Sequence, residues 1–92
     1  MRALQPATTS AFRKDVKRCK RAHLSMGDLK AVMDRLINQT SLEAKHRDHR
    51  LSGNNKDFRE CHIHPDWLLV YRIEGNVITF TRTGSHAELF GM

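Results

Sequence analysis

The sequence lacks most features that define membrane, secreted and metal-stapled proteins. No apolar run approaches the roughly 18 residues of a membrane span, and the opening residues 1–5 lack the apolar stretch of a secretory signal. The two cysteines, Cys19 and Cys61, have no C-x-x-C spacing, which argues against a disulfide framework and a cysteine zinc site. We therefore expect a cytoplasmic protein with buried free thiols.

Proline and glycine are also scarce, at two and five residues, which excludes a low-complexity or collagen-like chain. The chain has 92 residues, of which 39% are hydrophobic. Single domains cluster near ~100–150 residues, so there is material for one modest core. The sequence predicts one domain over residues 1–92.

Negative charge is the third deficit, because sixteen Lys and Arg stand against ten Asp and Glu, a net charge of +6. Residues 1–50 hold twelve basic and five acidic side chains, a balance of +7, whereas residues 51–92 hold four and five, a balance of −1. A surplus of this kind favours a polyanionic partner: RNA, DNA, an anionic membrane or an acidic protein.

A short strand over residues 2–5, ended by Pro6, and then a strongly basic helix are expected at the N-terminus, with Thr8, Thr9 and Ser10 as candidate helix caps. The helix has an apolar stripe at Phe12, Val16 and Cys19. Six cations occupy nine positions and are offset only by Asp15: Arg13, Lys14, Lys17, Arg18, Lys20 and Arg21. A phosphate-binding role is slightly favoured over an ordinary solvated face.

A second helix is expected to begin at Ser25, which with Asp28 has the S-x-x-D form of a capping box. Its positions at i, i+3, i+4, i+7 and i+8 are apolar: Leu29, Val32, Met33, Leu36 and Ile37. The segment 38–40 ends the helix. This stripe predicts core packing rather than a cofactor site, and the two helices predict a hairpin that needs a sheet to cover it.

The second half of the chain is typical of strands. A polar stretch from Glu43 and a turn signal at residues 52–55 precede three strand-like runs, over residues 58–64, 67–73 and 77–83. Ser85 offers a cap for a helical turn or two at the C-terminus. The predicted fold is α+β: a helical hairpin packed on a mostly antiparallel β-sheet, with a short C-terminal helical turn.

Histidine is the residue present in unusual number, with five of six histidines between His46 and His86. The period of two in a strand predicts that Glu60, His62 and His64 share one face, with Cys61 and Ile63 on the other. Pro65 then turns the chain and leaves Asp66 beside these histidines.

Three interpretations of the histidine cluster are open. Metal binding could use His46-x-x-His49 and His62-x-His64, although neither is a known zinc spacing. The histidines could also be inert. Acid-base cleavage of a phosphodiester is favoured, because it needs a proton acceptor, a proton donor and cations, and Arg59 and Arg82 are candidate cations. Phe90 could stack on an unpaired base or close the small core.

Blocks of sequence along nearly the whole chain resemble the RelE/ParE superfamily of bacterial type II toxins, and specifically its YafQ-type mRNA interferases. The blocks are Phe12-x-x-Asp15-Val16-Lys17, Leu36-Ile37-Asn38, Lys45-x-x-Asp48-His49-x-Leu51-x-Gly53, Arg59-Glu60-x-His62-Ile63-x-Pro65-Asp66-Trp67-Leu68-Leu69-Val70-Tyr71 and Arg82-Thr83-Gly84-Ser85-His86-Ala87-x-Leu89-Phe90. The last three are specific.

The resemblance implies a RelE-like endoribonuclease without a metal or other cofactor, which cuts mRNA on the ribosome and is held inactive by a cognate antitoxin. By analogy, the catalytic set is His49, His62, Asp66 and His86. His86 is expected to be the general acid, and Asp66, with His49 or His62, the base.

The supporting positions follow from the same resemblance. Arg82 is expected to stabilise the phosphorane and Phe90 to position a base, whereas Arg59 is a candidate cation from the residues alone. Glu60 stands where the family has Asp, so its carboxylate lies elsewhere, and His64 is expected at the surface. The basic first helix suits docking on ribosomal RNA.

Two alternatives remain beside the enzyme interpretation. One is a ParE-like toxin that inhibits gyrase by binding alone. Such a toxin would not need the cluster of histidines. The other is an RNA-binding module without turnover.

Overall fold

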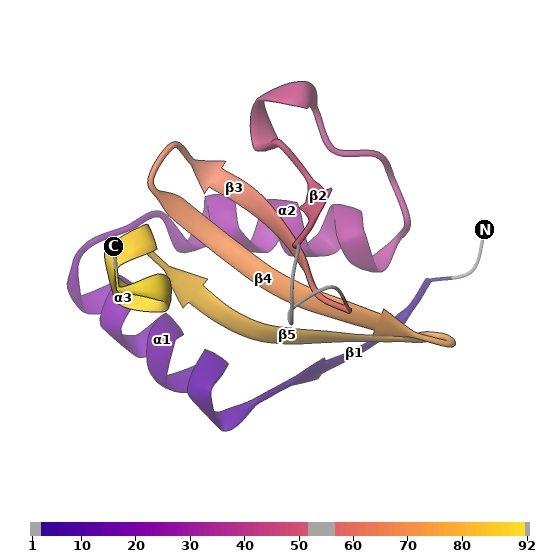
Figure 1. Cartoon of the computed structure of the whole chain (residues 1–92), viewed down its shortest axis with the longest axis horizontal. Coiled ribbons are helices and arrows are strands. Elements are labelled where there is room, and N and C mark those ends of the chain that lie inside the picture. The colour runs from indigo at the N-terminus through magenta and orange to yellow at the C-terminus, as the bar shows by residue number, and fades with distance from the viewer. Residues whose placement is uncertain (1–2, 52–56, 92) are drawn as a thin grey trace.

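The computed structural model describes residues 3–51 and 57–91 as helices over one twisted sheet (Figure 1). In chain order the elements are β1 (Gln5–Thr8), α1 (Ser10–Arg21), α2 (Met26–Ile37), the 3₁₀ turn η1 (Ala44–His46), β2 (His49–Arg50), β3 (Arg59–His64), β4 (Trp67–Glu74), β5 (Val77–Gly84) and α3 (His86–Phe90). The five strands lie in the order β1-β5-β4-β3-β2. All neighbours are antiparallel except β1 and β5. The predicted α+β class is confirmed.

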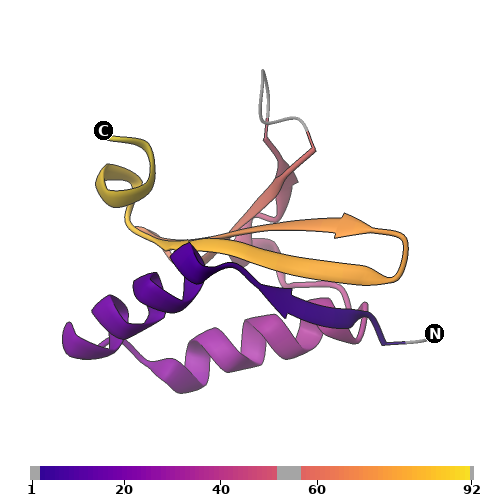
Figure 2. The ribbon, with the colours of Figure 1, turned by 90° about the horizontal axis from the view of Figure 1, so that it is seen from below.

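Helices α1 and α2 lie on the same side of the sheet, as the turned view shows (Figure 2). The expected stripes form the core: Phe12 and Cys19 of α1, Leu29, Val32 and Leu36 of α2, and Cys61, Ile63, Leu69, Tyr71, Ile78 and Phe80 of the strands are buried. The helical hairpin therefore covers one face of the sheet, as predicted. The opposite face is not covered by α1 and α2 and can carry a functional site. In the described part of the chain, the helices are too short and too polar to span a membrane.

The N-terminal strand differs from its predicted position, because Pro6 lies inside β1 rather than ending a strand over residues 2–5. The described part of that range supplies only Gln5 to the strand. Strand β1 is at the edge of the sheet and the Gln5 N–H donates to Asn76 O at 2.7 Å. Since backbone groups alternate along a strand, the position of the missing Pro6 N–H faces solvent, where no ladder bond is lost.

The helix caps largely follow the sequence. The Thr9 hydroxyl caps α1 and the Ser25 hydroxyl accepts from the Asp28 N–H at 3.1 Å, but the Asp28 carboxylate bonds to His64 instead of completing a box. A complete capping box is present at α3, between Ser85 and Glu88. The turn expected at residues 52–55 lies outside the described residues.

Candidate active site

The face of the sheet opposite the helices carries two buried polar side chains on β3. Glu60 and His62 point to this face because Cys61 and Ile63 between them are in the core, and they are only 5% and 9% exposed. Burial of polar groups requires partners. His62 Nδ1 lies 3.2 Å from Pro65 O, and His62 Nε2 lies 3.5 Å from a Glu60 oxygen. The predicted alternation is confirmed for these two residues.

His64 does not share their face, contrary to the expected alternation. The pairing register of β3 with β4 shifts between His62 and His64, which breaks the period of two. The His64 ring stacks on Trp67 and its Nε2 bonds to Asp28 of α2 at 2.7 Å. His64 is exposed, as expected from the family resemblance, and lies apart from the histidines of the site.

The second histidine of the site is placed by the capping of α3. Ser85 caps this helix, so His86 is its first residue, and it contacts the turn between β3 and β4 through Asp66. Asp66 in that turn accepts from the His86 Nδ1–H at 2.8 Å and from the His86 backbone N–H at 3.2 Å. These hydrogen bonds lower the pKa of Asp66, chiefly through the side chain of His86. Asp66 is therefore an ionised partner that orients the imidazole.

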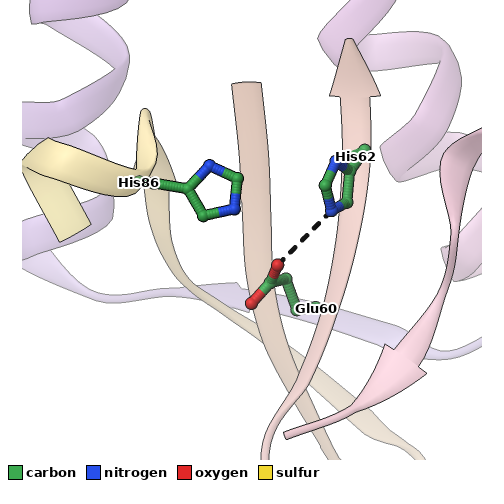
Figure 3. Close-up of side chains that lie close together, drawn as sticks. All are labelled: Glu60, His62 and His86. Carbon is green, nitrogen blue, oxygen red and sulfur yellow. Dashed lines mark ion pairs between the residues drawn. The ribbon is translucent and has the colours of Figure 1, made fainter. Parts of the chain in front are cut away.

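The two histidine–carboxylate pairs face each other across a short gap. The rings of His62 and His86 point toward one another with Glu60 beneath them (Figure 3), and their centroids are 5.8 Å apart. One ligand atom from each of Glu60, His62 and His86 lies within 4.8 Å of the others, a spacing that could also hold a metal ion. The metal spacings considered from sequence, which involve His46 and His64, are not brought together in this way.

His49 stands at the rim of the same site, on β2. Its ring centroid is 6.5 Å from that of His62. Its Nδ1 bonds to Arg47 O at 2.6 Å, and since a carbonyl only accepts, Nδ1 carries the proton and neutral His49 presents an unprotonated Nε2. An open depression of about 700 Å³ is lined by the rim and the pairs: Arg47, Asp48, His49, Glu60, His62, Pro65 and His86.

The two predicted cations lie apart from this depression. Arg59 is on the helix-covered face, where its Nε is 3.3 Å from both Asp48 and the Tyr71 hydroxyl. Arg82 is bound to Asp15 of α1, although it also lines a small hollow of about 140 Å³ with Phe90. Phe90 is 39% exposed and so is available to a ligand. The structure thus brings together the histidines and carboxylates more tightly than the arginines.

Three supporting residues were not predicted as such. His46 donates from Nδ1 to His62 O at 2.7 Å and so holds the β3 backbone. Asp48, which directly precedes His49 in the sequence, accepts a hydrogen bond from the Tyr71 hydroxyl at 2.5 Å. Asp15, buried on α1, binds Arg82. Asp48 and Asp15 stand in the sequence blocks that resemble the family, and this could have marked them as candidates. For His46 the sequence offered only its position among the other histidines.

The comparisons with known proteins agree along nearly the whole chain. Residues 4–91 match the family described as "Bacterial toxin of type II toxin-antitoxin system, YafQ". The mRNA interferase toxin YafQ of Escherichia coli K12 is 44% identical over 81 residues, which is 87% of this chain and 88% of that protein.

Solved structures give the same result. A chain in the crystal structure of the E. coli DinJ–YafQ toxin–antitoxin complex matches with a TM-score of 0.91 and 40% identity, over 97% of this chain and 99% of that one. The metal-bound toxin from Helicobacter pylori matches with a TM-score of 0.89 and 42% identity, over 95% and 99% of the two chains. The chain therefore belongs to the YafQ family of bacterial toxins of type II toxin–antitoxin systems.

Proposed function

We propose that this chain is an mRNA interferase, an endoribonuclease that cuts mRNA by acid-base catalysis. Its E. coli relatives carry that name. The observation that supports the chemistry is the pair of histidine–carboxylate couples, His86 with Asp66 and His62 with Glu60, whose rings are 5.8 Å apart. A phosphodiester with its 2′-hydroxyl on one side and its leaving 5′-oxygen on the other needs a base and an acid at such a separation.

His86 is the proposed general acid. Asp66 binds its Nδ1–H, which leaves Nε2 free to hold the second proton of the imidazolium and give it to the leaving 5′-oxygen. The bond from phosphorus to the 5′-oxygen then breaks as the 2′-oxygen attacks phosphorus, and the products are a 2′,3′-cyclic phosphate and a 5′-hydroxyl. In this scheme Asp66 orients the general acid His86, whereas the sequence-based expectation placed Asp66 on the side of the base.

The proposed base is His62 or His49. A proton taken by His62 Nε2 would be held by Glu60 while Nδ1 bonds to Pro65 O. In its neutral form His49 has Nε2 as the acceptor nitrogen, because Nδ1–H donates to Arg47 O. Arg82 is the proposed source of positive charge for the phosphorane, and Phe90 the proposed stacking surface for a base.

The proposed reaction uses no metal. A metal ion on Glu60, His62 and His86 would occupy the nitrogen atoms that must exchange protons. We therefore expect EDTA to leave cleavage of naked RNA unchanged. Activity that is lost in EDTA and restored by Zn²⁺ or Mg²⁺ would contradict this expectation.

The partners are proposed from the charge and from the relatives. One relative was crystallised in complex with the antitoxin DinJ, and we propose that a cognate antitoxin likewise binds this chain. The exposed cations of α1 support docking on ribosomal RNA, which would place the protein in the cytoplasm on translating ribosomes.

The test is to incubate the protein with programmed ribosomes or with naked mRNA and to map new 5′ ends by primer extension. We expect new ends inside codons at the ribosomal A site, and none with His86→Ala at equal folded concentration. Cleavage that persists in His86→Ala would overturn the assignment of the acid. Intact mRNA in every lane would overturn the nuclease proposal and favour gyrase inhibition or RNA binding alone.

A further inference from the structure

Helix α1 carries one buried carboxylate in the middle of its basic surface. The side chain of Asp15 is 4% exposed, yet it lies among cations that the sequence places on the solvent side. Its oxygens accept from Arg18 Nη1 at 2.7 Å, Arg82 Nε at 2.5 Å, Arg82 Nη2 at 3.2 Å and the Thr83 N–H at 3.1 Å. Burial alone would raise the pKa of Asp15, but these hydrogen bonds outweigh it and lower the pKa.

The partners of Asp15 belong to the strand end that leads to the site. Strand β1 pairs with β5 only as far as Phe80, so the outer edge of β5 is open beyond it. Asp15 accepts the Thr83 N–H there, and Arg18 Nη2 donates to Thr83 O at 2.9 Å. Two side chains of α1 thus complete the backbone bonding of the strand that continues into α3.

Arg82 itself belongs to the face of the site. In the sheet, Glu60 of β3 pairs with Val70 of β4, and Val70 pairs with Arg82 of β5, so these three residues form one row. Adjacent strands are about 4.8 Å apart, which places Arg82 about 10 Å along the sheet from Glu60. Its Nε and Nη2 are held by Asp15, its side chain is 36% exposed, and it lines the hollow beside Phe90.

The same network reaches the helix that carries His86. Arg18 Nε forms an ion pair with Glu88 at 2.7 Å, and Glu88 Oε1 accepts from the Ser85 N–H in the capping box. A Cβ at Gly84 would lie 2.5 Å from Arg18 Nη2 and 2.9 Å from Glu88 Oε1. Gly84, two residues before His86, therefore lies against this pair at a position where a side chain would clash with it.

We propose that Asp15 is a positioning residue of the RNA-cleaving site: it holds Arg82 in one orientation, with the remaining Nη1 directed to RNA, and with Arg18 and Glu88 it fixes the start of α3. This inference rests on the proposed nuclease function. Both carboxylate oxygens of Asp15 accept along one edge of the guanidinium, from Nε and from Nη2, whereas an amide has a single acceptor oxygen. Asn at this position would therefore leave Arg82 free to turn.

The kinetic test compares Asp15→Asn with Asp34→Asn, a matched control on α2 whose half-exposed carboxylate pairs with exposed Lys30. We expect Asp15→Asn to lower kcat for RNA cleavage by about 10–100-fold with KM changed by less than about threefold, since small errors in positioning act mainly on the transition state. Asp34→Asn should cleave at the wild-type rate. Unchanged kcat in folded Asp15→Asn would overturn the proposal.

A double variant separates positioning from general stability. If Asp15 acts largely through Arg82, then Asp15→Asn should slow cleavage less in the Arg82→Ala background than in the wild type, because only its effect on the start of α3 remains. An additional loss in the double variant equal to that of Asp15→Asn alone would overturn the proposal. Thermal unfolding of each variant provides the folded fraction used to normalise the rates.

A measurement without cleavage distinguishes a failure of the positioning role from a failure of the proposed nuclease function. In nuclear magnetic resonance of the intact protein, the Arg82 Nε–H should exchange slowly with water, and it should exchange faster in Asp15→Asn. Titration with a 2′-O-methyl RNA, which cannot be cut, should shift the Arg82 guanidinium signals in the wild type. Equal exchange in both proteins, or no shift with RNA, would overturn the positioning role even if mRNA is cleaved. Absence of cleavage by the wild type would instead overturn the proposed function.

Discussion

The pairing of Asp66 with His86 depends on two hydrogen bonds to one carboxylate oxygen. The His86 side chain and backbone N–H both bind Asp66 Oδ1, so the carboxylate orients both the imidazole and the start of α3. These bonds hold the pKa of Asp66 below its usual 3.8, and the carboxylate is therefore ionised throughout the range in which histidines titrate. In the proposed mechanism, Asp66 therefore orients His86 and does not exchange protons.

We predict that Asp66→Asn slows mRNA cleavage by roughly 10–100-fold, because the amide removes the charge that stabilises the His86 imidazolium. Quantitative primer extension at pH 7 measures the effect. Glu74→Gln, at the distant β4–β5 turn, is the control and should cleave normally. Equal rates for Asp66→Asn and the wild type would contradict a role for Asp66 in the acid step.

The residues of the site were predictable where they depend on local pattern. The period of two placed Glu60 and His62 on one face, and the Ser85 cap placed His86 at the start of a helix. The pattern failed for His64, because the register shift follows from how β4 pairs with β3. It could not reveal Asp15 as buried, since Arg82 and Thr83 are 67 and 68 residues away in the chain.

Among the elements, the segment of η1 and β2 is held mainly by polar contacts. It was expected only as a polar stretch, and its two-residue strand is too short to give a periodic signal. Asp48 anchors it by accepting from the Tyr71 hydroxyl and from Arg59. Pro6 in β1 is the converse case: a residue that usually ends a strand is tolerated because β1 is an edge.

We predict that Tyr71→Phe lowers the free energy of unfolding by about 1–2 kcal/mol, the usual cost of a lost buried hydrogen bond. Burial, followed by the Asp48 carboxylate, raises the pKa of Tyr71, so the hydroxyl is a donor at neutral pH. Urea unfolding measures the stability, and hydrogen exchange of the amides of residues 47–50 should become faster. Unchanged exchange there would contradict the anchoring of the His49 segment.

The contact of α1 with β5 should make stability depend on pH. The folded pKa of Asp15 is below the usual 3.8, so its stabilisation is fully present above that value and is lost as the pH falls through the folded pKa. We predict that Asp15→Asn is less stable than the wild type by about 3 kcal/mol at pH 7 and that the difference shrinks below pH 4. Urea unfolding at pH 7 and pH 3 measures both differences, and a difference that is constant with pH would contradict this origin.

At the scale of the whole molecule, the positive charge and the candidate site lie on different parts of the surface. Helices α1 and α2 cover one face of the sheet (Figure 2), and Glu60, His62 and His86 gather on the other (Figure 3). Arg82 and Arg18 are bound to Asp15, whereas Lys14, Lys17 and Lys20 of α1 are exposed. These lysines can therefore attract a large RNA without taking part in the chemistry.

We predict that replacing Lys14, Lys17 and Lys20 together by Gln weakens binding to structured RNA and flattens its salt dependence. Each phosphate contact releases counterions and adds about 0.7–0.9 to the slope of log K against log salt, so the triple variant should lose about two units of slope. Filter binding between 50 and 200 mM salt measures the slope, with Lys30→Gln on α2, which removes one cation that pairs with Asp34, as the control. Cleavage of a short naked RNA at low salt should be nearly unchanged, because the histidine–carboxylate pairs are intact. A triple variant with the wild-type slope would show that RNA docks elsewhere, and one that loses short-RNA cleavage would place α1 in the path of the cut strand.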